Sequence, residues 1–134
     1  MNVNKRGKIM KIKCGTDIIE ISRIKKSIDE LGNKFINKIF TQDEIAYCES
    51  KKIQKFQHYA ARFAAKEAIF KAISESVEDK YSLDWKDFEV ICDGNGKPHI
   101  NIIADIRKDD IESMDISLSH CKEYAIANVV ILYK

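Results

Sequence analysis

The predicted helix over residues 61–72, ARFAAKEAIFKA, constrains the fold of this 134-residue chain more than any other segment. At about 100° per residue, its small side chains fall on one narrow stripe. The stripe consists of Ala61, Ala65, Ala68, Ile69 and Ala72. Such a stripe lets a helix backbone pack closely against a sheet or another helix. The pattern therefore predicts a long helix, from about residue 56 to residue 74, with one buried face.

The opposite side of this helix carries charge among aromatic residues. Phe63 and Phe70 flank Glu67, and Lys71 follows one turn later. A carboxylate in apolar surroundings is unfavourable unless it has a partner. One explanation is an i,i+4 ion pair between Glu67 and Lys71, which contributes about 0.2–0.5 kcal/mol. The other is a metal ion or a phosphate group as the partner, and the helix pattern leaves both open.

The segments before this helix predict one strand and two short helices. A strand is expected over residues 10–17, and the next helix is expected to begin at Ser22 and to end at Gly32. Its apolar residues at helical spacing are Ile24, Ile28 and Leu31. Thr41 and Glu44 match the capping box that begins a helix.

After a polar stretch over residues 75–84, which is expected to be a loop, the hydrophobic period becomes that of strands. Two hairpins are expected, with strands over residues 85–91, 99–103, 115–119 and 124–132. Helices early and antiparallel strands late are typical of an α+β fold. We therefore expect helices packed on a small, mainly antiparallel sheet.

Length and composition favour one domain. With 45% hydrophobic residues, the chain can form a core of its own over residues 10–134, after an expected disordered leader over residues 1–9. No stretch approaches the roughly 18–20 apolar residues of a membrane span, so a cytoplasmic protein without a membrane partner is expected. The cysteines lack any C-x-x-C spacing and are expected to be reduced, structural thiols; they are Cys14, Cys48, Cys92 and Cys121.

The charge is distributed unevenly along the chain. Residues 1–71 hold 16 Lys and Arg against 8 Asp and Glu, whereas residues 72–134 hold 7 against 13. The basic half could attract an acidic protein or a phosphorylated small molecule, or the two halves could simply form solvated surfaces of opposite charge. No nucleic-acid partner is expected, because the aromatic residues among the basic ones fall at helical core spacing; they are Phe40, Tyr47, Phe56 and Tyr59.

Asp17 is a second candidate carboxylate, expected at the end of the first strand, where it could project past the sheet edge. An Asp at a strand end is about as often a helix N-cap as a metal ligand. Together with Glu67, it would form the carboxylate pair that Mg²⁺ prefers when water and phosphate oxygens complete the shell. Lys71 could then neutralise charge on a phosphate.

His120 and the turn over residues 94–98 each allow two interpretations. His120 either contacts a ligand or is a turn histidine that hydrogen-bonds to the backbone. The turn either holds a phosphate through its N–H groups and Lys97, or is a plain hairpin turn. The Walker A and G-x-G-x-x-G spacings are absent from the sequence.

Several motifs occur in the order seen in holo-[acyl-carrier-protein] synthases: GTDIIEISRI at 15–24, FTQDE at 40–44, RFAAKEAIFKA at 62–72, GKP at 96–98 and SLSH at 117–120. Over residues 10–132 the chain resembles this 4′-phosphopantetheinyl transferase family. The resemblance implies a Mg²⁺-dependent transferase of fatty acid biosynthesis. Its substrates would be coenzyme A and a serine of apo acyl carrier protein, and its products holo carrier protein and adenosine 3′,5′-bisphosphate.

The resemblance also implies residue roles. Asp17 and Glu67 would bind Mg²⁺, or Mn²⁺ in its place, with Glu67 or a metal-bound water taking the serine proton. Lys71 would stabilise or protonate the departing phosphate. Arg23 and Lys26 would dock the acidic carrier protein. The implied coenzyme A contacts come from Arg62, Lys66, Gly96, Lys97, Pro98 and His120.

A homotrimer with active sites between subunits is a further implication, and the segment 96–98 would then come from a neighbouring subunit. Phe70 departs from the family pattern, because a smaller residue often takes its place. Two alternatives stay open. One is a Mg²⁺-dependent hydrolase of nucleotide pyrophosphates, in which water replaces the carrier serine. The other is a non-catalytic module that binds coenzyme A or a carrier protein and needs neither carboxylate.

Overall fold

The computed structural model describes Gly7 and residues 10–73, 83–103 and 110–134. The helices are α1 (Ile21–Leu31), α2 (Asn33–Ile39), α3 (Gln42–Ser50) and α4 (Lys55–Ile73), with short 3₁₀ helices η1 (Lys52–Gln54) and η4 (Trp85–Asp87). The strands are β1 (Lys11–Glu20), β2 (Phe88–Cys92), β3 (Pro98–Ile102), β4 (Ile111–His120) and β5 (Tyr124–Tyr133). The expected leader and the expected loop over residues 75–84 lie almost entirely outside the described residues.

The main sheet is antiparallel, as expected, with strand order β1-β5-β4. Side chains alternate between its two faces, and this alternation is clearest along the central strand β5. The buried residues of β5 are Ala125, Ala127, Val129 and Ile131. One face of the sheet therefore belongs to the core, and the other is open to solvent.

β1 is longer than the sequence predicts. The expected end was Asp17, but pairing with β5 continues to Glu20. The strand continues because Ile18 pairs with Ile126 and keeps the two-residue alternation. Asp17 therefore lies inside the strand, opposite Ala127 on the core face, and does not project past the sheet edge.

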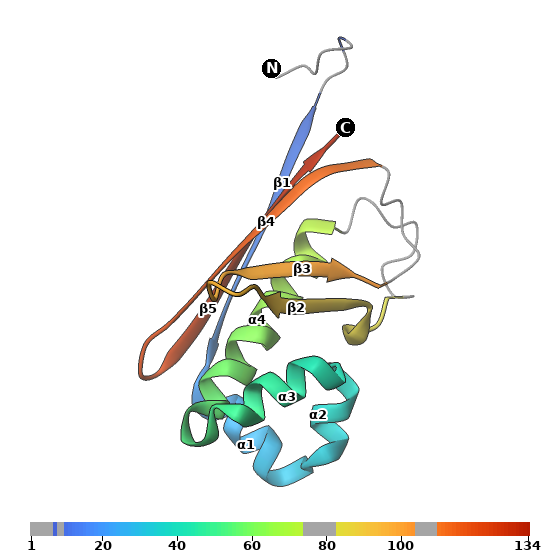
Figure 1. Ribbon diagram of the computed structural model, residues 1–134. Coiled ribbons are helices and arrows are strands. Elements are labelled where there is room, and N and C mark those ends of the chain that lie inside the picture. Colours follow the sequence, from blue (N-terminus) through green and yellow to red (C-terminus); the bar gives the residue numbers. More distant parts are fainter. Residues whose placement is uncertain (1–6, 8–9, 74–82, 104–109) are drawn as a thin grey trace.

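α4 packs along the core face of the main sheet (Figure 1). The predicted alanine-rich stripe is confirmed, because each of its five residues is at most 4% exposed. The closest approach is at Gly15 of β1, where an added Cβ would overlap the carbonyl oxygen of Ala68. Glycine at this position therefore lets the helix backbone rest directly on the strand.

α1, α2 and α3 gather at the N-terminal end of α4 (Figure 1). Gly32 ends α1 with a φ of 58°, and its N–H donates to the Ile28 carbonyl. The predicted capping box is present at the start of α3, with Thr41 as N-cap and Glu44 as its partner. Leu31 departs from the predicted core pattern, since this last residue of α1 is 55% exposed.

β2 and β3 form the first predicted hairpin, which packs against α4 and β4. The far face of the main sheet exposes large apolar side chains, between 38% and 61% exposed. They are Ile12, Ile18, Tyr124, Ile126 and Val130. None of the described helices is long and apolar enough to cross a membrane.

Candidate functional site

Asp17 of β1 and Glu67 of α4 line a common cavity of about 310 Å³. Its walls also include Arg23, Phe63 and Tyr124. Strand and helix meet closely here because Gly15, two residues before Asp17, gives the backbone of α4 room to approach. Sheet–helix packing therefore brings together the two carboxylates that the sequence offers as a metal-binding pair.

The electrostatics of this pair suit a cation. The pKa of Glu67 is raised, mainly by burial and also by the negative charge of Asp17, while Lys71 lowers it. A cation between the carboxylates would relieve their repulsion. Among the described residues no group of three or more His, Cys, Asp or Glu could hold a metal. A metal here would therefore need water or substrate oxygens as its remaining ligands, which is the coordination that Mg²⁺ favours.

Lys71 connects α4 to β1. Its Nζ donates to the Thr16 carbonyl oxygen at 2.9 Å and lies 3.3 Å from Oδ1 of Asp17. The Lys71 side chain is exposed, so its ammonium group is open to solvent beside Asp17. The structure thus gives Lys71 a partner on β1, which helical spacing within α4 does not predict.

Arg62 of α4 is a buried cation with incomplete hydrogen bonding. Its guanidinium carbon lies 4.0 Å from the centroid of the Tyr47 ring, and its Nη2 is 3.5 Å from Sγ of Cys92, a weak acceptor. Its Nε has no hydrogen-bond partner among the described residues. A buried guanidinium usually pairs with a carboxylate or a phosphate. Arg62 therefore remains a candidate for binding an anion.

His120, at the end of β4, lies beside a second imidazole, that of His58 on α4, with 6.1 Å between ring centroids. The pKa of His58 is lowered by burial and, to a smaller extent, by the charges of Arg62 and Lys51 and by His120. These groups create a positive region that suits a phosphate. His58 is not among the site residues predicted from the sequence. Its position four residues before Arg62, on the same helix face, is the signal that could have identified it.

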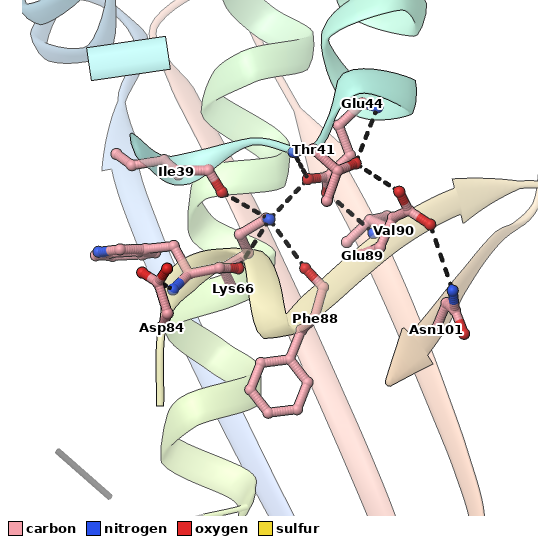
Figure 2. A network of polar contacts seen from close by, with 10 residues as sticks. Ile39, Thr41, Glu44, Lys66, Asp84, Phe88, Glu89, Val90 and Asn101 are labelled. Carbon is pink, nitrogen blue, oxygen red and sulfur yellow. Dashed lines mark hydrogen bonds and ion pairs between the residues drawn. The ribbon is translucent and has the colours of Figure 1, made fainter. Parts of the chain in front are cut away.

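The structure contradicts the expected role of Lys66 as a phosphate ligand. Its side chain is fully buried, and Nζ lies 2.6 Å from Oε1 of Glu44 (Figure 2). Nζ also donates to the carbonyl oxygens of Ile39, Phe88 and Trp85 at 2.8, 2.9 and 3.0 Å. Burial lowers the pKa of Lys66, and Glu44 acts in the opposite direction. The three protons of an ammonium group are fully used by these partners.

The turn of the β2–β3 hairpin is a plain turn, contrary to the phosphate-holding interpretation. The N–H groups of Asn95 and Lys97 donate to Oδ1 of Asp93 at 2.9 and 3.0 Å, and the Gly96 N–H donates to the Asp93 carbonyl. Asp93 thus takes the donors that a phosphate would need. The segment 96–98 is not among the residues that line the Asp17–Glu67 cavity within one chain.

The two basic residues expected to dock a partner both lie on the exposed side of α1. Arg23 also lines the cavity, whereas Lys26 follows three residues later on the helix. Lys25, between them, is paired with Asp29 at 2.6 Å. The surface of α1 beside the carboxylate pair is therefore basic and accessible.

Comparison with known proteins identifies the family. Residues 13–129 match the sequence model of the 4′-phosphopantetheinyl transferase superfamily. The chain belongs to this family. The holo-[acyl-carrier-protein] synthase of Ruminiclostridium cellulolyticum is 43% identical over 126 residues, which cover 91% of this chain and 92% of that protein. The synthase of Protochlamydia amoebophila is 39% identical over 90% of this chain and 98% of that protein.

Solved structures of phosphopantetheinyl transferases confirm the α+β fold. The holo-(acyl-carrier-protein) synthase of Bacillus anthracis, in complex with CoA (3′,5′-ADP), superposes with a TM-score of 0.76 at 33% identity, covering 94% of this chain and 100% of that one. The Helicobacter pylori synthase, in complex with coenzyme A, gives a TM-score of 0.73 at 29% identity, covering 88% and 98% of the two chains. The transferase fold thus extends over nearly the whole chain.

Proposed function

We propose that this protein is a holo-[acyl-carrier-protein] synthase. The proposal rests on the similarity to such synthases, which spans nearly the full length of both chains. The shared cavity of Asp17 and Glu67 supports it. In the reaction, the oxygen of a carrier-protein serine bonds to the β-phosphorus of coenzyme A. The bond from that phosphorus to adenosine 3′,5′-bisphosphate breaks, and the serine proton passes to a base.

Asp17 and Glu67 would hold a divalent cation, Mg²⁺ or Mn²⁺, at the reacting pyrophosphate. When bound, this cation withdraws charge from the pyrophosphate as its bond breaks. The repulsion between the two carboxylates and their shared cavity support this assignment. Few protein ligands and open coordination positions are what a cation that also binds phosphate requires.

Glu67 would accept the serine proton. The burial that raises its pKa makes this carboxylate a stronger base than an exposed one. Lys71, whose ammonium group lies 3.3 Å from Asp17, would place positive charge or a proton at the departing bisphosphate.

The phosphates of coenzyme A would bind where Arg62 lies near His58 and His120. The unpaired Nε of Arg62 and the positive field at His58 support this placement. Lys66 has no part in it, because its donors are used inside the protein. An anion at this position would complete the hydrogen bonding of a buried guanidinium.

Acyl carrier protein would dock on α1. Arg23 and Lys26 are exposed there, and Arg23 reaches the rim of the cavity. Opposite charges across such an interface accelerate association and orient the partner. Docking on α1 would bring the carrier serine to the carboxylate pair.

A homotrimer would cover the far face of the main sheet. In an isolated chain, the five large apolar side chains on that face stay in contact with water. An apolar patch of this kind is typical of a protein–protein interface. Packing of this face against copies of the same chain would also allow the hairpin segment 96–98 of one subunit to approach the coenzyme site of the next. Because Asp93 occupies the N–H groups of this turn, Gly96, Lys97 and Pro98 would contribute only in the assembly and through the Lys97 side chain, not through backbone donors.

The test is the intact mass of purified apo acyl carrier protein after incubation with this protein, coenzyme A and Mg²⁺, with EDTA as the control. We expect a gain of one phosphopantetheine that requires the metal. Release of adenosine 3′,5′-bisphosphate without a carrier would favour the hydrolase. Binding of coenzyme A without any product, with several carriers, would favour the non-catalytic module.

A further inference from the structure

Lys66 of α4 is a buried charge that connects separate parts of the chain (Figure 2). Its ammonium group is bonded to Ile39 at the end of α2, to Glu44 of α3 and to Phe88 at the start of β2. One side chain of α4 thereby fixes the helix relative to the α2–α3 connection and to the β2–β3 hairpin.

Glu44 extends this network on the other side of the ion pair. Its Oε1 accepts from the Thr41 N–H at 2.9 Å, and its Oε2 accepts from the Val90 N–H at 3.0 Å. The Thr41 hydroxyl donates to Oε2 of Glu89 at 2.5 Å. Both oxygens of the Glu44 carboxylate therefore have donors, and a satisfied buried network of this kind holds its members in one arrangement.

Ala68 is the point at which α4 contacts strand β1. Lys66, Glu67 and Ala68 are consecutive, so their side chains point about 100° apart around the helix. The Ala68 carbonyl lies against Gly15 of β1, Lys66 enters the network, and Glu67 faces the cavity with Asp17. Rotation or sliding of α4 would disturb the contacts of Lys66 or Ala68 and would move Glu67 relative to Asp17.

Stability is a weak reason to bury this ion pair. Replacement of a buried pair by apolar side chains of similar volume is often neutral or stabilising. An apolar residue at position 66 would join the core that Ala65 and Ile69 already form. Directed hydrogen bonds, unlike apolar contacts, specify a single orientation of the helix. Orientation matters at a reactive group, because a displacement of about 1 Å can lower a rate about 10²-fold.

We propose that Lys66 is a positioning residue for Glu67. Lys66 fixes the rotation of α4 about its axis and its position along that axis, so that the Glu67 carboxylate faces Asp17 across the cavity. Lys66 contacts neither substrate and acts only through the helix. This inference rests on the proposed function, in which Glu67 serves the transfer reaction.

The test compares Lys66→Met, which removes the charge and shortens the unbranched side chain by one atom, with Ile131→Ala. Ile131 is buried on β5, outside both the network and the cavity. Both variants are measured at a temperature at which circular dichroism shows them to be folded. The readouts are Mn²⁺ affinity by electron paramagnetic resonance in the presence of coenzyme A, and kcat and KM for carrier modification.

For Lys66→Met we expect Mn²⁺ affinity and kcat to fall by about 10- to 100-fold, with little change in the KM for coenzyme A. Ile131→Ala should keep the wild-type values. Wild-type Mn²⁺ affinity and kcat in folded Lys66→Met would overturn the inference. So would equal losses in both variants, since these would indicate general loosening of the protein.

Lys66→Met leaves the Glu44 charge unpaired in the interior, which is strongly destabilising. If it does not fold, Lys66→Met/Glu44→Gln, which removes both charges, is measured instead, with the same expected losses. Failure of both variants to fold would assign Lys66 to stability alone and overturn the inference. A wild-type protein that modifies no carrier would overturn the proposed function, while the Mn²⁺ affinities would still test the position of Glu67.

Discussion

Glu67 occupies an unfavourable position for a carboxylate that has only a structural role. Phe63 lies beside it in the cavity wall, and Asp17 places a like charge across the cavity. Lys71 offsets this only in part, because burial and Asp17 together still raise the pKa of Glu67. Removal of the Glu67 charge should therefore affect activity far more than stability.

We expect Glu67→Gln to lower kcat by about 10²- to 10⁴-fold, because an amide neither holds a divalent cation well nor accepts the serine proton. The free energy of unfolding should stay the same or rise, since the repulsion with Asp17 is removed. The measurements are the rate of holo carrier formation and urea unfolding. Glu112→Gln, the same change at an exposed position of β4, is the control. Wild-type turnover in Glu67→Gln would contradict the role of this carboxylate.

Cys48 should make the free energy of unfolding depend on pH in the alkaline range. Burial raises the pKa of this fully buried thiol from 9.0 to about 12. Below pH 9 the thiol is protonated in both the folded and the unfolded protein, so its contribution to the stability of the fold is fully present. As the pH rises from 9 towards 12, the unfolded chain releases a proton that the folded chain keeps. The free energy of unfolding should then decrease by about 1.4 kcal/mol per pH unit.

Urea unfolding between pH 8.5 and 10 measures this decrease. Cys48→Ala should have a shallower pH dependence than the wild type, whereas Cys121→Ala, at an exposed cysteine, should leave it unchanged. An identical pH dependence in Cys48→Ala and the wild type would show that other groups cause the loss of stability.

The contact between β1 and α4 positions the two carboxylates. Gly15 and Ala68 contact each other through their backbones. Ala68 follows Glu67 directly, and Gly15 lies two residues before Asp17. A side chain at Gly15 would meet a backbone carbonyl, which cannot move away as a flexible side chain can. The absence of a Cβ at one residue therefore sets the distance between helix and strand.

Gly15→Ala should lower the free energy of unfolding by about 2–3 kcal/mol, because α4 must shift away from β1. It should also lower kcat, since the shift separates Glu67 from Asp17. Gly94→Ala is the matched control: no atom lies within 4 Å of the added Cβ, so a change close to zero is expected. Urea unfolding and carrier modification measure both effects. Equal stability of the two variants would show that the β1–α4 contact tolerates a methyl group.

The exposed apolar face of the main sheet leads to a prediction about the oligomeric state of the protein. Light scattering should give the mass of three chains for the wild type and a smaller mass for Ile126→Glu, which places a charge on that face in the central strand β5. Ile53→Glu, at an exposed isoleucine of η1, should leave the mass unchanged. A wild-type protein that is monomeric at micromolar concentration would contradict the trimer and the shared coenzyme site.

Much of the fold is predictable because it depends on short-range spacing. The capping box of Thr41 and Glu44, the helix end at Gly32 and the alanine stripe of α4 involve residues that are close in sequence. For Asp17 and Glu67, the sequence predicts the kind of ligand but not how close the two carboxylates lie. Two carboxylates in suitable segments indicate a cation site, but their spacing in the sequence gives no distance between them.

The α+β pattern is predictable from the amino-acid sequence alone, which also contains the ordered motifs and the residue types that suit phosphate and metal. Which basic residues a ligand can reach depends on the tertiary structure. Lys66 and Lys71 lie on the same helix, yet Lys66 is buried in an ion-pair network and Lys71 is exposed beside Asp17. The physical reason is that burial and hydrogen bonding depend on segments far away in the sequence, such as β2 beside Lys66 and β1 beside Lys71.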